Sequence, residues 1–288
     1  MASKIEIART VSELRRKILQ WRKKGFSIGL VPTMGALHDG HFSLVKKSIE
    51  TTDKTITSLF LNPKQFGANE DLTVYPRDEI GDAAALDARG VDLLFAPSVE
   101  EIYKVNFSTK VSVSGIGDVL EGVCRPSFFT GVATIVAKLL IQTLPDRAFF
   151  GEKDLQQLHV IKRMVMDLNI PVEIVGCPTI RESDGLALSS RNVYLSATER
   201  ENSVLLYKVL NEISHTVLNG DPIKDSVSKA KTKLLNSGFS KVDYLTICDS
   251  SNFLELDILN EWAYVAGAAW IGKTRLIDNI KISLSNKN

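Results

Sequence analysis

The chain has 288 residues, more than one typical domain, and its 44% hydrophobic and 24% charged residues are ordinary for a globular protein. A formal net charge of +1 excludes the strongly basic character typical of nucleic-acid-binding proteins. The cysteines Cys124, Cys177 and Cys248 form no Cys-x-x-Cys pair, and we find neither a membrane segment nor a secretory signal. We therefore expect a cytoplasmic protein with no membrane or nucleic-acid partner.

Predicted helices alternate with short apolar strands in the first part of the chain. A capping box at Thr10–Glu13 predicts a helix that continues to Lys24 and ends at Gly25. Strands are expected at 27–31, 55–61, 91–95, 147–150 and 172–175, and helices at 41–51, 79–89, 129–144 and 154–168. Continuous apolar strands of this kind predict a parallel sheet covered by helices on both faces. Ligands of such sheets bind beyond the carboxyl ends of the strands.

The pattern changes after about Ile180. We expect one long helix over 197–218, a second over 223–235, and strands over 241–248, 262–271 and 275–282. This order predicts a smaller α+β domain with an antiparallel sheet. The fold class is therefore α/β, with a parallel-sheet domain over 1–180 and a smaller α+β domain over 181–288.

One segment matches a phosphate-binding pattern in an unsuitable context. Gly267–Thr274 fits G-x-x-x-x-G-K-[ST], but a P-loop must open a helix, and the residues that follow alternate like a strand. Trp270 and Ile271 also suit a buried strand. We interpret the segment as strand, with a P-loop ATPase that depends on Lys273 as the alternative.

The segment Pro32–His41 follows the first apolar strand directly and leads into a helix. Gly35 and Gly40 permit a ligand to approach the backbone closely, and a helix N-terminus favours phosphate. His38 and His41 are three residues apart, so both can face one ligand, where imidazolium groups would stabilise charge on phosphate oxygens. A metal-binding histidine pair and a simple helix cap are the alternatives.

Three further segments carry groups suited to an anionic ligand. Gly151–Gln157 opens a helix, where the dipole disfavours Lys153 unless an anionic ligand binds there. Leu188–Asn192 offers two hydroxyl groups and an arginine that suits phosphate. Asn62–Gln65 offers amides for a carboxylate or hydroxyl group. The alternatives are an exposed loop of ordinary mixed charge for Gly151–Gln157, which those residues alone favour, a helix cap for Leu188–Asn192 and a simple turn for Asn62–Gln65.

Together these segments resemble the pantoate–β-alanine ligase family of the nucleotidyltransferase superfamily. The resemblance covers about 28–195 and is carried by PTMGALHDGH from Pro32, NPKQFG from Asn62, YPR from Tyr75, GEKD from Gly151 and DGLALSSRN from Asp184. It continues weakly in TRLIDN from Thr274. The family implies a Rossmann-like N-terminal domain, a smaller domain that closes over the site, and commonly a homodimer.

The resemblance implies an ATP-dependent ligase that works in two steps. The carboxylate of (R)-pantoate attacks the α-phosphorus of MgATP, which gives pantoyl adenylate and pyrophosphate. The amine of β-alanine then attacks the adenylate, which gives pantothenate and AMP. Such chemistry needs positioning and charge stabilisation rather than a nucleophilic side chain. Mg²⁺ is expected on the ATP oxygens, and no protein-bound metal site is expected.

The resemblance also implies roles for individual residues. Catalytic roles are implied for His38, His41, Lys153 and Arg191, with His41 as the proton donor. ATP binding is implied for Met34, Gly35, Ala36, Leu37, His38, Asp39, Gly40, His41, Gly151, Glu152, Lys153, Asp154, Ile180, Leu188, Ser189, Ser190 and Arg191. Gln65 would hold pantoate and β-alanine, Gln157 would hold pantoate, and Asn62 would assist. Asp82 is a candidate contact for Mg²⁺.

The chain departs from the family pattern at one position. Many members have Arg-Pro-Gly-His-Phe where this sequence has Arg125-Pro-Ser-Phe128-Phe. Any contact made by that histidine is therefore in doubt here. A non-catalytic nucleotide-binding protein is the rival interpretation, and the presence of His41, Lys153 and Arg191 argues against it.

Overall fold

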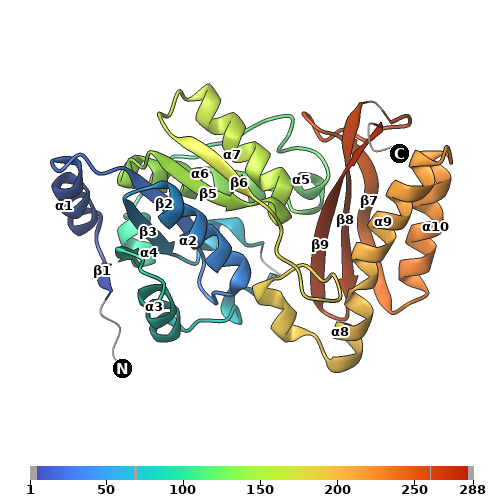
Figure 1. Ribbon diagram of the computed structural model, residues 1–288, viewed down its shortest axis with the longest axis horizontal. Helices are drawn as coiled ribbons and strands as arrows, with labels where there is room; N and C mark the ends of the chain where they lie inside the picture. The colour runs from blue at the N-terminus through green and yellow to red at the C-terminus, as the bar shows by residue number, and fades with distance from the viewer. Residues whose placement is uncertain (1–4, 68–69, 260, 285–288) are drawn as a thin grey trace. The chain divides into compact units, whose positions relative to one another are not determined.

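The computed structural model describes residues 5–67, 70–259 and 261–284 (Figure 1). The chain divides into two compact units. The first contains the chain up to Gly117, Arg125–Glu152 and Gln157–Pro178, and the second contains Asp118–Cys124, Lys153–Gln156 and the chain from Thr179 onward. No helix in these described ranges is long and apolar enough to cross a membrane.

The first unit is built on a six-stranded sheet in the order β1-β4-β3-β2-β5-β6, and every strand pair in it is parallel. The strands are β1 (Glu6–Ala8), β2 (Ile28–Thr33), β3 (Lys54–Leu59), β4 (Leu93–Phe95), β5 (Arg147–Gly151) and β6 (Glu173–Cys177). The predicted parallel sheet is therefore confirmed. The edge strand β1 was not predicted, because three residues give too short a pattern to recognise.

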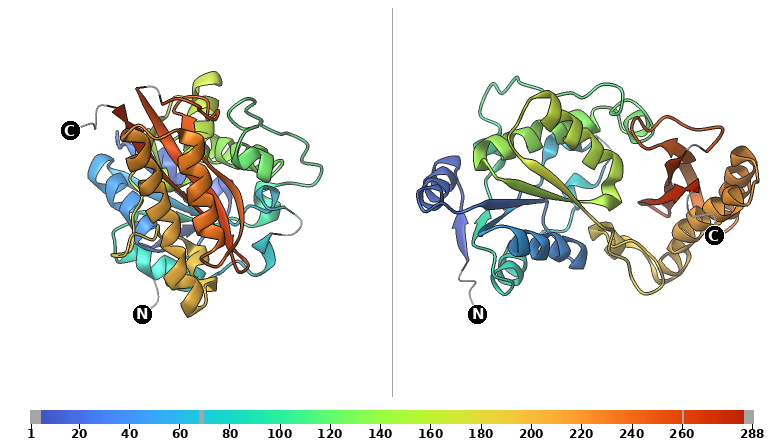
Figure 2. Two further views of the ribbon diagram at one scale, coloured as in Figure 1. Left: turned by 90° about the vertical axis from the view of Figure 1, so that its right-hand side faces the viewer. Right: turned by 45° about the horizontal axis from the view of Figure 1, so that its top comes forward.

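Helices cover both faces of this sheet, as Figures 1 and 2 show. One face packs against α1 (Val11–Arg22), α6 (Phe128–Thr143) and α7 (Leu155–Asp167). The other packs against α2 (Asp39–Thr51) and α3 (Glu79–Asp87). The unit also contains α4 (Val99–Ile102) and the 3₁₀ turns η1 (Pro63–Gln65) and η2 (Asp71–Thr73). The capping box expected at Thr10–Glu13 is present and begins α1.

The strand order reverses between β2 and β5. From β2 the chain proceeds to β3 and β4 on one side, and from β5 it proceeds to β6 on the other. In open α/β sheets this reversal creates the ligand-binding position, at the carboxyl ends of the strands. The segments that follow β2 and β5 therefore occupy the favoured place for a ligand. β2 also includes Pro32, where we had expected the strand to stop.

The second unit contains an antiparallel three-stranded sheet, which confirms the expected α+β architecture. Its strands are β7 (Phe239–Asp249), β8 (Trp262–Ile271) and β9 (Thr274–Ser283). Its helices are α5 (Glu121–Cys124), α8 (Ala197–Ser203), α9 (Leu205–Leu218) and α10 (Ile223–Leu235), with the 3₁₀ turns η3 (Glu152–Asp154), at the boundary between the units, and η4 (Ser190–Tyr194). Apolar residues of α9 and α10 pack against this sheet and form the core of the unit.

The structure decides two predictions for this unit, one about a helix and one about a strand. The single helix predicted over 197–218 is wrong, because the structure has two helices there, α8 and α9, which are separated at Val204. The strand interpretation is confirmed for Gly267–Ile271, which belong to β8, and for Thr274, which begins β9. Lys273 lies in the two-residue turn between β8 and β9, so no helix follows it.

Candidate active site

The loop after β2 is fixed by a buried carboxylate. Gly35 and Ala36 both have positive φ angles, 91° and 51°, which turns successive backbone N–H groups in one direction. Asp82 of α3 is 6% exposed, and its Oδ2 and Oδ1 accept hydrogen bonds from the N–H groups of Ala36 and Leu37, each at 2.9 Å. Burial raises the pKa of Asp82, and the two N–H donors oppose that shift. Both oxygens of Asp82 thus hold the loop, and the expected contact of Asp82 with Mg²⁺ stays a prediction.

His38 and His41 form a reciprocal cap at the start of α2. His38 Nδ1 accepts a hydrogen bond from the Gly40 N–H at 3.1 Å, and His41 Nδ1 accepts one from the His38 N–H at 3.3 Å. The two ring centroids are 4.1 Å apart. An Nδ1 atom that accepts a hydrogen bond carries no proton, so each neutral ring holds its hydrogen on Nε2. The helix-cap interpretation is therefore confirmed.

The metal-pair interpretation of these histidines finds no support in the structure. In the portion of the chain that the structure describes, no three His, Cys, Asp or Glu side chains gather as a metal site. A stable protein site for a transition metal needs at least three such ligands.

The loop after β3 holds Gln65 beside the loop after β2. Asn62 is 1% exposed, and its Nδ2 donates to Gln65 Oε1 at 2.9 Å and to the Gly131 carbonyl oxygen at 3.2 Å. Its Oδ1 accepts from the Tyr103 hydroxyl at 2.7 Å; burial raises the pKa of Tyr103 to about 12, so this hydroxyl keeps its proton. Gln65 Nε2 lies 3.1 Å from Met34 Sδ. Asn62 therefore orients the amide of Gln65.

The motif that follows β5 is divided between the two units. Gly151 and Glu152 belong to the first unit, whereas Lys153 and Asp154 belong to the second. The Lys153 side chain is 18% exposed, and its Nζ lies 4.0 Å from Asp154 Oδ1. Gln157, on α7, is again part of the first unit.

The segment after β6 folds back on itself within the second unit. The Leu188 N–H donates to the Ile180 carbonyl oxygen at 3.0 Å, next to an isolated bridge between Arg181 and Ala187. Ile180 and Leu188, for which contacts with different parts of ATP are proposed, are thereby neighbours. Beyond them Ser189 Oγ accepts from the Arg191 N–H at 3.3 Å and begins η4, which confirms the cap interpretation at Ser189.

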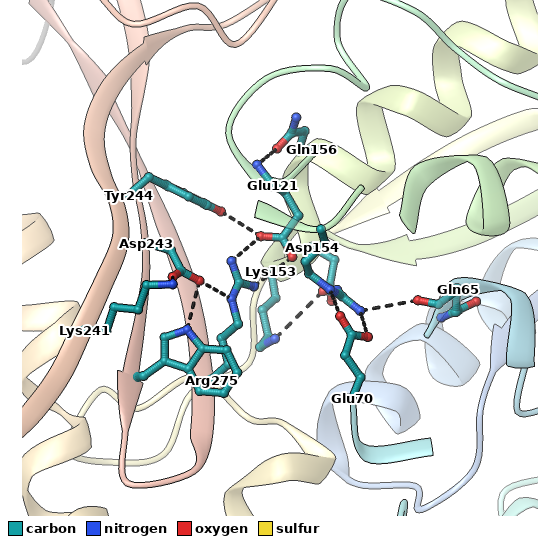
Figure 3. A network of polar contacts seen from close by, with 12 residues as sticks. Gln65, Glu70, Glu121, Lys153, Asp154, Gln156, Lys241, Asp243, Tyr244 and Arg275 are labelled. Carbon is teal, nitrogen blue, oxygen red and sulfur yellow. Dashed lines mark hydrogen bonds and ion pairs between the residues drawn. The ribbon is translucent and has the colours of Figure 1, made fainter. Parts of the chain in front are cut away.

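A buried charge network in the second unit was not predicted. Figure 3 shows Arg275 between two carboxylates: both Glu121 oxygens accept from its Nη atoms, at 2.8 and 2.9 Å, and Asp243 Oδ2 accepts from its Nε at 2.7 Å. The exposed fractions of these side chains are 12% for Arg275, 7% for Glu121 and 4% for Asp243. Burial opposes the charge of Arg275, yet the two carboxylates raise its pKa. Arg275 and Glu121 are 154 positions apart, so no local pattern could pair them.

Comparison with known proteins identifies a single family. The model of the pantoate-beta-alanine ligase family matches residues 6–281. A pantothenate synthetase of Paramagnetospirillum magneticum is 50% identical over 282 residues, which are 98% of this chain and 99% of that protein. One of Caulobacter vibrioides is 50% identical over 279 residues, 96% of this chain and 98% of that protein.

Solved structures agree with this assignment. The pantothenate synthetase of Thermus thermophilus is 44% identical, with a TM-score of 0.90, and the match covers 96% of this chain and 99% of that one. The pantoate-beta-alanine ligase of Francisella tularensis, in complex with beta-gamma ATP and beta-alanine, is 35% identical with a TM-score of 0.82, over 96% and 97% of the two chains. The chain belongs to the pantoate–β-alanine ligase family.

Proposed function

We propose that this protein joins (R)-pantoate to β-alanine at the expense of ATP, through a pantoyl adenylate. The observation that carries the proposal is its membership of the family over residues 6–281. The position of the family motifs supports it, since those that follow β2 and β5 flank the reversal of strand order, where nucleotides bind in such sheets. The Francisella tularensis complex supports ATP and β-alanine as substrates.

In this proposal the nucleotide phosphates meet donors held in advance by the fold. His38 and His41 present Nε2–H groups whose direction is fixed by the Nδ1 contacts to the backbone. Donors aimed in advance at oxygens that gain charge in the transition state are effective because they need no reorganisation during the reaction. Lys153 and Arg191 add positive charge that offsets the charge of the triphosphate.

The remaining nucleotide contacts are proposed for residues of the same motifs. The residues proposed for these contacts are Met34, Gly35, Ala36, Leu37, Asp39, Gly40, Gly151, Glu152, Asp154, Ile180, Leu188, Ser189 and Ser190. Ile180 is proposed for the adenine ring, and its main-chain bond to Leu188 brings an apolar side chain next to the segment proposed for the triphosphate. Closure of the second domain over the nucleotide stays a prediction.

Pantoate and β-alanine are proposed to bind through amide side chains. Gln65 would hold both substrates and Gln157 would hold pantoate, because an amide offers donors to a carboxylate and an acceptor to a hydroxyl group. Asn62 is nearly inaccessible, so its proposed contribution is to orient Gln65 rather than to contact substrate.

The two steps need no nucleophilic side chain. The pantoate carboxylate oxygen forms a bond to the α-phosphorus while the bond to the pyrophosphate oxygen breaks, and pyrophosphate leaves. The amine nitrogen of β-alanine then bonds to the carbonyl carbon, a proton is lost, and AMP leaves with the former anhydride oxygen. The chain contributes orientation and charge stabilisation, and Mg²⁺ enters as part of the MgATP substrate.

Isotope exchange tests the proposal directly. With MgATP and pantoate but no β-alanine, we expect labelled pyrophosphate to enter ATP, because the adenylate step is reversible. Adding β-alanine should then produce AMP and pantothenate in equal amounts. Exchange that requires β-alanine would rule out a separate adenylate.

The oligomeric state and location are further parts of the proposal. The resemblance implies a homodimer, for which sedimentation equilibrium should give a mass twice that of the 31.8 kDa chain. A cytoplasmic location agrees with the free thiols of Cys124, Cys177 and Cys248. Sedimentation and cell fractionation test these two points.

A further inference from the structure

Asn279 of β9 holds the main chain at Lys153. Its side-chain Nδ2 donates to the Lys153 carbonyl oxygen at 3.0 Å, across a sequence separation of 126 positions. Both residues belong to the second unit. A hydrogen bond to this carbonyl fixes the backbone from which the Lys153 side chain starts.

Asn279 is itself held in place on both sides. Its N–H donates to Asp278 Oδ1 at 2.8 Å, and its carbonyl oxygen accepts from Arg181 Nη2 at 3.3 Å. Arg181 and Asp278 are joined by two further hydrogen bonds, at 2.6 and 2.8 Å, and the Asp278 side chain is only 4% exposed. Alternate residues of a strand face opposite sides, so Asp278 shares the helix-covered face with Leu276, and Asn279 projects from the other face.

The strand β9 also holds the other end of the segment Lys153–Gln156, through the intermediate residue Glu121. Gln156 Oε1 accepts from the Glu121 N–H at 3.2 Å. The carboxylate of Glu121 accepts two hydrogen bonds from Arg275 of β9, as Figure 3 shows. Arg275 and Asn279 lie four residues apart and therefore project from the same face of the strand. Thus β9 anchors the segment at both ends.

We propose that Asn279 is a positioning residue for the reaction with ATP: its bond to the Lys153 carbonyl holds Lys153 where its ammonium group meets the phosphates. The inference rests on the role proposed above for Lys153. A lysine carries its charge at the end of a four-carbon stem, so the position of its backbone sets the region that the ammonium group can reach. A misplacement of about 1 Å at a reacting group typically costs on the order of 10²-fold in rate.

The test compares two asparagines that make the same kind of bond. Asn279→Ala removes the donor to Lys153, and Asn211→Ala removes a matched donor, because Asn211 Nδ2 donates to the Tyr207 carbonyl oxygen at 2.8 Å on α9. Pyrophosphate exchange is measured for both variants and for Lys153→Ala. It is also measured for the double variant that combines Lys153→Ala with Asn279→Ala. ATP binding by calorimetry supplies the same comparison wherever exchange is too slow to follow.

We expect Asn279→Ala to lower kcat/KM for ATP by about 10- to 100-fold, with the KM for pantoate unchanged. Asn279→Gln keeps an amide donor and should recover part of the loss, and Asn211→Ala should match the parent enzyme. In the Lys153→Ala background, Asn279→Ala should cause no further loss, because the group it positions is gone. Were Asn279→Ala not to fold, Asn279→Gln would replace it in the same comparison.

Two results would overturn the inference about Asn279 but leave the role of Lys153 intact. In the first, Asn279→Ala is fully active while Lys153→Ala is impaired. In the second, Asn279→Ala causes the same loss of activity whether or not Lys153 is present. Full activity of Lys153→Ala is a different result. It would overturn the proposed role of Lys153 itself and, with it, the inference about Asn279.

Discussion

Asp82, in the helix α3, accepts a hydrogen bond at 2.9 Å from the backbone N–H of Ala36, in the loop that follows β2. The family resemblance suggested Asp82 as a contact for Mg²⁺, and the structure shows that both of its oxygens also hold the loop. The loop that precedes His38 and His41 is therefore braced from α3. Its conformation depends on a carboxylate more than 40 positions away.

Asp82→Asn should damage the loop. An amide has one acceptor oxygen, so one backbone N–H loses its partner, at a cost of about 1–3 kcal/mol in the free energy of unfolding. We expect pyrophosphate exchange to slow by about tenfold, at any Mg²⁺ concentration. Urea denaturation and exchange at increasing Mg²⁺ check both points, with Asp87→Asn, at the far end of the same helix, as control. Restoration of the rate by excess Mg²⁺ would instead identify Asp82 as a metal contact.

His41→Ala should slow adenylate formation by about 10²–10³-fold, the usual effect of losing one donor aimed at developing charge. The variant also loses the cap contact to the His38 N–H, which should cost about 1 kcal/mol of stability without unfolding the protein. Single-turnover formation of the adenylate measures the first effect. His215→Ala, on the surface of α9, is the matched histidine control. A near-normal single-turnover rate for His41→Ala would remove His41 from the mechanism.

Two lysines separate the nucleotide interpretations. Lys153→Ala should strongly reduce adenylation, because its positive charge is proposed to meet the phosphates. Lys273→Ala should change activity little, because Lys273 lies in the exposed turn between β8 and β9 rather than at a helix N-terminus. Exchange assays on both variants decide the matter. The opposite pattern would revive the P-loop interpretation.

Phe128→His should change the adenylation rate by less than about tenfold, or under ~1.4 kcal/mol of barrier. Phe128 begins α6 and packs partly against the core, and its ring lies 3.7 Å from the Arg125 guanidinium carbon. Arg125 is in turn paired with Glu70, at 2.6 and 2.7 Å, so the position serves packing and stacking. Exchange kinetics and a thermal melt measure the effect. A gain in rate beyond tenfold would show that the histidine of relatives has a chemical role.

His159 of α7 should make stability fall in mild acid. Burial, with a smaller contribution from Lys162, lowers the pKa of His159 from 6.5 to about 4. Between these values the unfolded chain binds a proton that the native state does not, so the free energy of unfolding decreases as the pH falls from about 6.5 to about 4. His159→Gln should lose less stability than the parent between pH 7.5 and pH 5, measured by urea denaturation. An identical loss in both proteins would contradict the assignment.

Local patterns in the sequence predicted most elements of the fold. The apolar runs of β2 and β5 need only their own residues to be recognised, because burial on both faces of a sheet leaves no room for polar positions. Helix ends such as Thr10–Glu13 were also readable, since a cap is made by neighbours in the chain. The short β1, without a pattern of its own, and the division into two helices at Val204 were not recognised.

The same distinction between local patterns and distant contacts applies to the candidate site. The sequence by itself determined which loops we propose for the chemistry, because motifs such as Pro32–His41 and Gly151–Asp154 are contiguous and their residue types suit phosphate. Only the tertiary structure decided what holds those loops in place: Asp82 for the first and Asn279 for the second. Each of these supports is a single hydrogen-bonding side chain brought from a distant element, and a contact across many residues leaves no periodicity or spacing in the sequence from which to infer it.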